Sequence, residues 1–301
     1  MTSSLRVPTL PFRKRRPFVF LVLAITLVLL VVWGLSALVG HLDRKGVFSG
    51  PRLGEVVLEG FIGDVARTVE WTERLRRDPS VVGVLLRIDS SGGAVAPSQE
   101  MYAAVKRLAD TKPVVVSMGT VAASGGYYVA VAGREIFANP STLTGSIGVR
   151  VQITNLQGLM ERIGVSAQDL TTGAFKSTGS PYKPMTDEEK AYLMELLNDM
   201  QDEFVSTIAK GRNLSPEAVA PLADGRVFTG RQALAANLID KLGDRQAAIQ
   251  RLMELCGLAE RKPEILKAPA KAQPLWQRLL TAAVELDATR SAAASRYMFV
   301  Y

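Results

Sequence analysis

An uninterrupted apolar stretch near the N-terminus restricts the fold of this chain more than any other feature. No charged residue occurs from Pro17 to Leu42, with His41 taken as neutral, and Phe18 to Val39 is dense in Leu, Val, Ile and Phe. About 20 apolar residues suffice for a helix to cross the hydrocarbon core of a bilayer. The sequence therefore predicts a transmembrane anchor over residues 18–42, and not a helix buried in a soluble domain.

Basic residues before the span predict its orientation. They are Arg6, Arg13, Lys14, Arg15 and Arg16, with no acidic residue among positions 1–17. A basic flank is retained in the cytoplasm, so we expect the rest of the chain on the extracytoplasmic side. A cleavable signal peptide would have a shorter apolar region and an A-x-A-like site. Arg15-Arg16 resembles a twin-arginine signal, but the apolar run after it is too long for one.

Charge and the scarce residue types exclude several classes of function. The formal net charge is +7, and without the five N-terminal basic residues it is about +2. The body is thus near neutral, which disfavours nucleic-acid binding. Cys256 is the single cysteine and His41 the single histidine. We therefore expect no disulfide, no metal site and no cofactor, and no histidine near a nucleophile.

Short buried strands alternate with helices beyond the anchor. Val81–Ile88 and Pro113–Met118 are near-continuous apolar runs, as in strands that are buried on both faces. This alternation predicts an α/β fold with a largely parallel sheet. Further strands are expected at 55–60, 135–138 and 147–153, helices at 64–77, 97–108, 124–131 and 187–211, and turns at 89–93 and 119–123.

The most unusual segment runs from Gly119 to Ala130. It follows a predicted buried strand, and α/β proteins bind ligands at the carboxyl ends of their strands. Ser124 lies among small residues where a helix begins, and the amide groups of a helix N-terminus favour an anion. Ser124 is therefore a candidate nucleophile, although an ordinary serine N-cap is the alternative for this segment alone.

Lys176 is a candidate base, because acid–base chemistry without histidine requires Lys, Asp, Glu or Tyr. Small and apolar residues flank it, and burial favours the neutral amine of a lysine. A competing Ser-x-x-Lys motif at Ser180 to Lys183 is disfavoured, since Pro184 moves Lys183 out of the helical region. The two glycines of Asp89–Gly93 permit an amide directed at a carbonyl oxygen, although alone this is an ordinary turn.

Together these segments resemble the signal peptide peptidase A (protease IV) family of serine proteases. The matching stretches, in order over residues 54–260, are Asp89–Gly93, Ala123–Tyr128, Thr144–Val149, Gly173–Ser177, Gly225–Gly230 and Ala235–Gly243. Two positions depart from the family pattern. Ser91 stands where the family usually has proline, and Asn237 where it usually has glycine.

The resemblance implies a Clp protease/crotonase-like fold and a Ser–Lys dyad. Ser124 would be the nucleophile and Lys176 the general base, with the amides of Gly93 and Gly125 as the oxyanion hole and Ser146 orienting the lysine amine. It implies a membrane-anchored endopeptidase that hydrolyses signal peptides and other short apolar peptides. The single copy of the motifs suggests a homo-oligomer of several subunits, since one such chain carries one complete dyad.

The expected domain organisation follows from the anchor and the resemblance. It comprises a cytoplasmic basic segment (1–17), the anchor (18–42), a linker (43–53), the protease domain (54–262), and a linker with a C-terminal tail (263–301). We expect a single-pass protein of the bacterial inner membrane. The alternatives are a non-proteolytic membrane-bound scaffold of the same fold and a crotonase-like acyl-CoA enzyme. The apolar tail end, Tyr297–Tyr301, is expected to pack on its own domain or to occupy a substrate groove.

Overall fold

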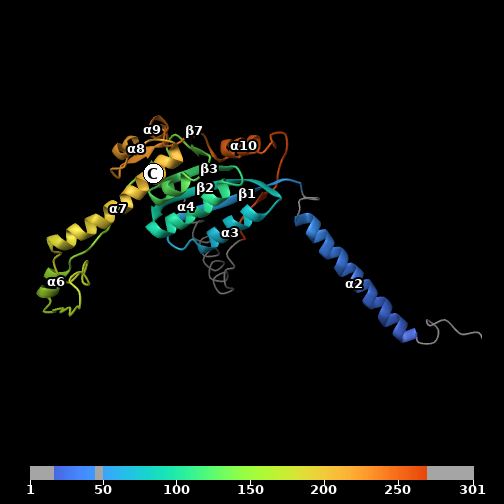
Figure 1. Cartoon of the computed structure of the whole chain (residues 1–301), viewed down its shortest axis with the longest axis horizontal. Coiled ribbons are helices and arrows are strands. Elements are labelled where there is room, and N and C mark those ends of the chain that lie inside the picture. The colour runs from blue at the N-terminus through green and yellow to red at the C-terminus, as the bar shows by residue number, and fades with distance from the viewer. Residues whose placement is uncertain (1–16, 45–49, 270–301) are drawn as a thin grey trace, which may run out of the picture. The chain divides into compact units, whose positions relative to one another are not determined.

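The computed structural model describes residues 17–44 and 50–269 (Figure 1). The strands are β1 (Arg52–Ile62), β2 (Val81–Gly93), β3 (Val114–Ala123), β4 (Glu135–Ala138), β5 (Leu143–Gly145), β6 (Val227–Thr229), β7 (Lys241–Leu242) and β8 (Ile265–Leu266). The helices are α2 (Pro17–Arg44), α3 (Ala66–Arg77), α4 (Val95–Ala109), α5 (Gly125–Ala130), α6 (Gln157–Arg162), α7 (Asp187–Arg212), α8 (Pro216–Val219), the 3₁₀ helix η1 (Ala220–Leu222), α9 (Gly230–Ala235) and α10 (Arg245–Leu255). The expected tail end, Tyr297–Tyr301, lies outside the described residues, as does most of the basic segment.

Helix α2 coincides with the expected anchor. Its segment Phe18–Leu38 is long and apolar enough to cross a membrane, and none of it is buried inside the protein. The exposed apolar side chains include Trp33. A helix whose described apolar side chains are exposed on all sides is consistent with a membrane span.

The eight strands within the described residues form one sheet. Its main order is β6-β5-β3-β2-β1-β8, and β4 pairs with β3 and with β7. All pairs are parallel except β5 with β6. The prediction of an α/β fold with a largely parallel sheet is confirmed.

Both faces of the sheet are covered, which explains the continuous apolar runs of β2 and β3. Alternate residues of a strand point to opposite faces. Val84 and Leu86 pack in the larger core with residues of α4 and α5, whereas Leu85 packs with Ile249 and Leu252 of α10. Figure 1 shows α3 and α4 on one side of the strands and α10 on the other. A strand enclosed in this way needs apolar residues at every position.

Two predicted turns are strands in the structure. Strand β2 continues through Asp89–Gly93, where its last two residues pair with Phe61 and Ile62 of β1. Strand β3 continues through Gly119–Ala123, where its last residues pair with β5. The serines and glycines of these segments resemble turn sequences. Pairing with neighbouring strands, which is not visible in the local sequence, makes them extended.

Two other expectations also differ from the structure. Residues 147–153 were expected to form a strand, but the strand in this region is β5, at Leu143–Gly145. Ile147 is fully buried. The apolar character of the segment therefore reflects packing of this side chain and not strand pairing. Within the segment expected as a linker from residue 263, Ile265 and Leu266 form the edge strand β8 beside β1.

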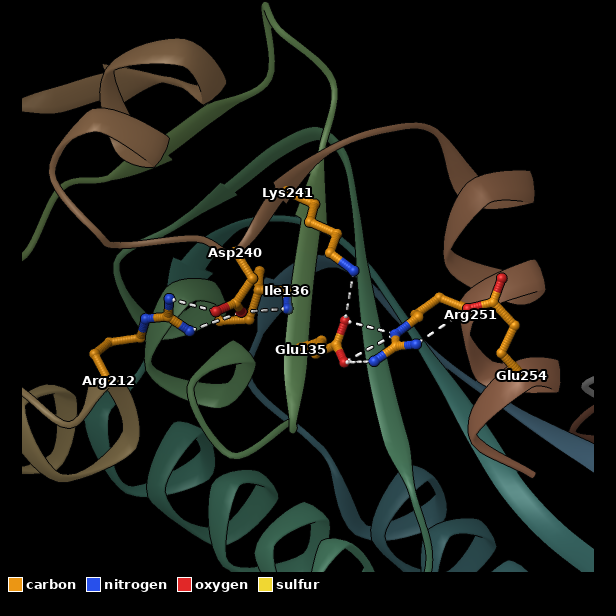
Figure 2. A network of polar contacts seen from close by, with 7 residues as sticks. All are labelled: Glu135, Ile136, Arg212, Asp240, Lys241, Arg251 and Glu254. Carbon is orange, nitrogen blue, oxygen red and sulfur yellow. Dashed lines mark hydrogen bonds and ion pairs between the residues drawn. The ribbon is translucent and has the colours of Figure 1, made fainter. Parts of the chain in front are cut away.

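A network of ion pairs joins the C-terminal elements to the sheet (Figure 2). The guanidinium of Arg251 on α10 donates to both carboxylate oxygens of Glu135 on β4, at 2.7–3.0 Å. Lys241 of β7 lies 3.2 Å from the same carboxylate. Nearby, Arg212 of α7 makes two 2.9 Å bonds to Asp240. The Asp240 carboxylate also accepts the amide of Ile136. Charged groups thus fix α7, β7 and α10 to one short strand.

The lowered pKa of the Glu135 carboxyl leads to a prediction of how the stability of the fold depends on pH. The hydrogen bond from Arg251 holds its pKa below the ordinary value of 4.5. Such a group stabilises the fold above about pH 4.5, and its contribution is lost as the pH falls through the lowered pKa. We expect Glu135→Gln to reduce the free energy of unfolding by about 2 kcal/mol near pH 7. Denaturant titrations should show wild type and variant converging in acid.

The matched control is Glu254→Gln. Glu254 also pairs with Arg251, but 45% of its side chain is exposed. An exposed pair contributes less than about 1 kcal/mol, so this variant should unfold nearly as the wild type does. Equal losses in the two variants would contradict the role given to Glu135.

Candidate active site

A cavity of about 1120 Å³ lies at the carboxyl ends of β2, β3 and β5. Four of the five residues predicted from the sequence as site residues line it, namely Gly93, Ser124, Gly125 and Ser146. The fifth, Lys176, is not among its lining residues. The position agrees with the rule that open α/β sheets bind ligands beyond the carboxyl ends of their strands.

Ser124 occupies the turn between β3 and α5 in an unusual backbone conformation. Its φ is 51° and its ψ is −122°, and a positive φ is uncommon for a residue with a Cβ. The Ser124 amide donates to the carbonyl of Gly145 at 2.7 Å, and its carbonyl accepts from Tyr128. The side chain makes no helix-capping bond. The hydroxyl is therefore not used as an ordinary N-cap, and Ser124 is among the residues that line the cavity.

Glycines let the end of β2 pack against the Ser124 turn. A Cβ at Gly92, whose φ is +104°, would lie 2.8 Å from the Cβ of Ser124 and 2.9 Å from the amide nitrogen of Gly125. A Cβ at Gly93 would lie 2.2 Å from the carbonyl oxygen of Ile62. A Cβ at Gly125 would lie 2.3 Å from the Ser98 hydroxyl and 3.4 Å from the Gly93 amide nitrogen. The backbones of Gly93 and Gly125 thus lie close together beside Ser124.

Polar groups of β2 hold this glycine segment in place. The buried hydroxyl of Ser90 donates to the carbonyl of Gly60 at 2.5 Å and accepts from the amide of Gly92 at 3.1 Å. The Asp89 carboxylate accepts the amide of Val121 on β3. Each strand end is therefore tied to its neighbour by a side chain as well as by the sheet ladder. Such rigidity is what a preorganised site requires.

Ser146 enters the cavity from the end of β5. Its φ is 49°, so two serines of the site have positive φ. The amide of Ser146 donates to the carbonyl of Arg226 at 2.8 Å, and the hydroxyl of Thr144 donates to the carbonyl of Ala122 at 2.6 Å. These bonds fix Ser146 on the strand that also receives the Ser124 amide.

Much of the cavity wall is apolar, and the sequence reading missed it. The wall includes Phe61 at the end of β1, Tyr128 on α5, and Met194, Met200 and Phe204 on α7. The Tyr128 ring packs edge-on against Phe204, with 5.2 Å between centroids. Burial raises the pKa of the Tyr128 hydroxyl. The sequence feature that could have predicted this wall is the apolar content of α7, which exceeds what one buried helix face needs.

One carboxylate, that of Asp224, is among the residues that line the cavity. Hydrogen bonds from the side chain and the backbone of Arg226 lower the pKa of Asp224 to about 2. The carboxylate is therefore ionised at all ordinary pH values and already has a partner. It is poorly suited to accept a proton from Ser124.

Lys176 lies in a segment that we call the arm, defined as residues 150–192. No residue from 151 to 188 is buried, and all of them are described. In Figure 1, α6 and the first half of α7 lie beyond the sheet. The loop after Lys176 contacts Glu189, which precedes the cavity residue Phe204 by 15 positions in α7. The cavity wall itself begins earlier in α7, at Met194, which is 5 positions or about 7.5 Å of helix after Glu189.

No group of three or more His, Cys, Asp or Glu side chains that could hold a metal occurs in the described part of the chain. The cavity lining combines glycines, serine and tyrosine hydroxyls and apolar side chains with the amides of Gln99, Asn198 and Gln201 and the charged groups of Arg150 and Asp224. Such a lining suits the binding of a peptide backbone and apolar side chains.

Comparison with known proteins identifies the class. Residues 106–259 match the family model described as Peptidase family S49. A Synechocystis protein named as a protease is 44% identical over 196 residues, which cover 65% of this chain and 70% of that protein. Protease 4 of Salmonella typhi is 37% identical over 62% of this chain but only 30% of its own length. The chloroplastic serine protease SPPA of Arabidopsis thaliana is 36% identical over 70% of this chain and 30% of its own length.

The chain is therefore a serine protease. It belongs to Peptidase family S49, and its resemblance to the signal peptide peptidase A family is confirmed. The matched residues 106–259 include Ser124 and Lys176.

The close approach at Gly125 yields a prediction. Gly125→Ala places a methyl group 2.3 Å from the buried Ser98 hydroxyl and 3.4 Å from the Gly93 amide nitrogen, so the Gly125 backbone or the Ser98 side chain must shift. We expect hydrolysis of a fluorogenic apolar peptide to fall at least about 100-fold in kcat/KM. Gly148→Ala is the control in the same cavity, since its Cβ would meet no atom closer than 3.4 Å. Similar losses in both variants would contradict this account of the site.

Proposed function

We propose that this protein is a membrane-anchored serine endopeptidase in which Ser124 is the nucleophile and Lys176 the general base. The observation that supports this most is the Ser124 turn. Its positive φ, its uncapped hydroxyl and the adjacent backbones of Gly93 and Gly125 occur together at one wall of the cavity. Strain of this kind accumulates at functional sites.

The proposed reaction follows from these groups. The Ser124 hydroxyl attacks the scissile carbonyl carbon while the neutral amine of Lys176 takes its proton. The amides of Gly93 and Gly125 stabilise the oxyanion. The amine then returns the proton to the leaving nitrogen, and the C–N bond breaks to give an acyl-enzyme. In the second half of the reaction, water gives a proton to the same amine and attacks the acyl carbon. The ester bond to Ser124 breaks, and the amine returns the proton to the Ser124 oxygen. Ser146 is proposed to orient the amine by hydrogen bonding.

We propose further that the amine reaching Ser124 belongs to a neighbouring copy of the chain. Lys176 of the same chain is exposed on the arm and outside the cavity. The arm also exposes large apolar side chains, such as Leu159 (58%), Ile163 (65%) and Leu170 (91%). Exposed apolar surface of this extent marks an interaction site. A homo-oligomer would cover it and complete each dyad between two copies.

The substrates proposed are signal peptides and other short apolar peptides. The cavity exceeds the usual volume of a small-molecule pocket, about 300–1,000 Å³, and its wall includes Met194, Met200 and Phe204. Flexible and aromatic apolar side chains accommodate varied apolar residues.

A Clp protease/crotonase-like architecture is also proposed. It rests on the resemblance to the family and on the close approach of the Gly93 and Gly125 backbones at two strand ends of the parallel sheet.

The dyad is tested by Ser124→Ala and Lys176→Ala. Each should reduce kcat for an apolar peptide at least about 1,000-fold without lowering the melting temperature, because groups that act as a unit fail together. Lys210→Ala, at an exposed position of α7, is the control and should retain activity. Activity close to that of the wild type in Lys176→Ala would refute the assignment.

The same two variants test whether dyads form between copies. Co-expressed Ser124→Ala and Lys176→Ala chains would place an intact serine beside an intact lysine at about a quarter of the sites in a randomly mixed oligomer. Activity should therefore return in the co-purified mixture although each variant alone is inactive. A mixture that stays inactive, in assemblies shown to contain both chains, would contradict a shared dyad.

We propose that α2 anchors the protein in the bacterial inner membrane with the catalytic domain on the extracytoplasmic side. The apolar length of α2 and the five basic residues before it support this. A reporter that folds only outside the cytoplasm, fused after residue 301, should be active. A reporter active only in the cytoplasm should be silent at that position, and the reverse pattern would overturn the orientation.

A further inference from the structure

Glu189 is the one buried residue between Gly148 and Glu203, a stretch that the structure describes throughout. Its relative exposure is 3%, whereas Asp187 and Glu188 in the same helical turn are exposed. Burial of a carboxylate is unfavourable unless hydrogen bonds and opposite charges compensate it. The residues that supply those bonds therefore indicate what the carboxylate holds in place.

All the donors to Glu189 come from the chain that follows Lys176. Its Oε1 atom accepts from the Lys183 ammonium at 2.5 Å and from the Thr178 hydroxyl at 3.4 Å. Its Oε2 atom accepts the Thr186 amide at 3.0 Å, within a capping box at the start of α7. The bonds from Lys183 and from the Thr186 backbone hold the pKa of the Glu189 carboxyl below its ordinary value.

The loop around Lys176 is also fixed on its other side. The ring of Phe175 packs on Tyr192, with 5.0 Å between centroids. Tyr192 lies three residues after Glu189, on the same face of α7. The Lys176 amide donates to the carbonyl of Gly173, and the Thr178 amide donates to that of Phe175. The residue before Lys176 and the second residue after it are therefore both held against α7.

Glu189 also distinguishes between the two lysines of the loop. It forms an ion pair with Lys183, and among the described residues no ion pair involves Lys176. A carboxylate partner stabilises the charged form of an amine. A lysine that acts as a base must lose its proton, so the pairing leaves the proposed base without a partner that would oppose this.

We propose that Glu189 is a positioning residue, which sets the Lys176 amine through the loop contacts of Thr178 and Lys183. This inference rests on the proposed function, because it assigns a role to a group that acts through the proposed base. Glu189 itself does not touch the substrate. It acts by fixing, on the first turn of a long helix, the backbone that carries Lys176.

The test measures kcat and KM separately for full-length protein in detergent. Glu189→Ala should lower kcat on the order of 100-fold, as displacement of a catalytic group by about 1 Å does. Its KM should change less than about twofold, since the cavity residues Met194 and Met200 remain in the helical part of α7. Glu189→Gln keeps one acceptor oxygen, which can take the Thr186 amide, and an NH2 group that can donate to the Thr178 hydroxyl, but it loses the ion pair with Lys183. It should therefore lose less than about tenfold in kcat.

A double-mutant cycle separates positioning from general destabilisation. Glu189→Ala introduced into Lys176→Ala should cause no further loss of the residual activity, because a residue that acts through Lys176 has nothing left to position. Glu188→Gln, on the exposed neighbour, is the matched control and should behave as the wild type does.

Three outcomes would overturn the proposal. They are unchanged kcat in Glu189→Ala, a rise in KM that accounts for the loss in kcat/KM, and an additive loss in the Lys176→Ala background. These results are distinct from failure of the proposed function itself, which would show as retained activity in Lys176→Ala alone.

Discussion

The contact between the end of β2 and the turn after β3 is the constraint on which the site depends. Two backbones approach so closely there that a methyl group at Gly92 or Gly125 would collide with its neighbours. The positive φ of Ser124 is tolerated because the sheet fixes both sides of the turn, through the carbonyl of Gly145 and the pairing of β3 with β5. A residue in a strained conformation persists only where its surroundings over-determine it. The buried Val-rich strands provide that rigidity.

The sequence predicted the parts of this arrangement that depend on local composition. The apolar runs of β2 and β3 indicated strands enclosed on both faces, and the small residues around Ser124 indicated a close approach of backbone and substrate. The sequence did not predict that Asp89–Gly93 and Gly119–Ala123 are extended, because their conformation comes from pairing with β1 and β5. Strand pairing is a property of distant segments, and a serine–glycine sequence carries no local trace of it.

The other part that the sequence could not supply is the distribution of burial in the arm. Lys176 was expected to be a buried lysine because small and apolar residues surround it in the sequence, yet it is exposed in the single chain. Flanking residues report on the environment only where the chain packs on itself. In the arm several large apolar side chains are exposed among the described residues, and the proposed contact between copies would cover them. Glu189, in contrast, lies among acidic residues in the sequence and is the one that is buried.

The length of helix α7 fixes where the lysine loop lies relative to the cavity. It is continuous from Asp187 to Arg212, with the carboxylate of Glu189 near one end, Phe204 in the cavity wall, and Arg212 bonded to Asp240 near the other end. The helix therefore sets the distances between these three residues, at about 1.5 Å along its axis for each residue. One added residue would also turn the Glu189 end by about 100° relative to the cavity. The number of residues in α7 thus sets both the distance and the direction of the lysine loop relative to the cavity.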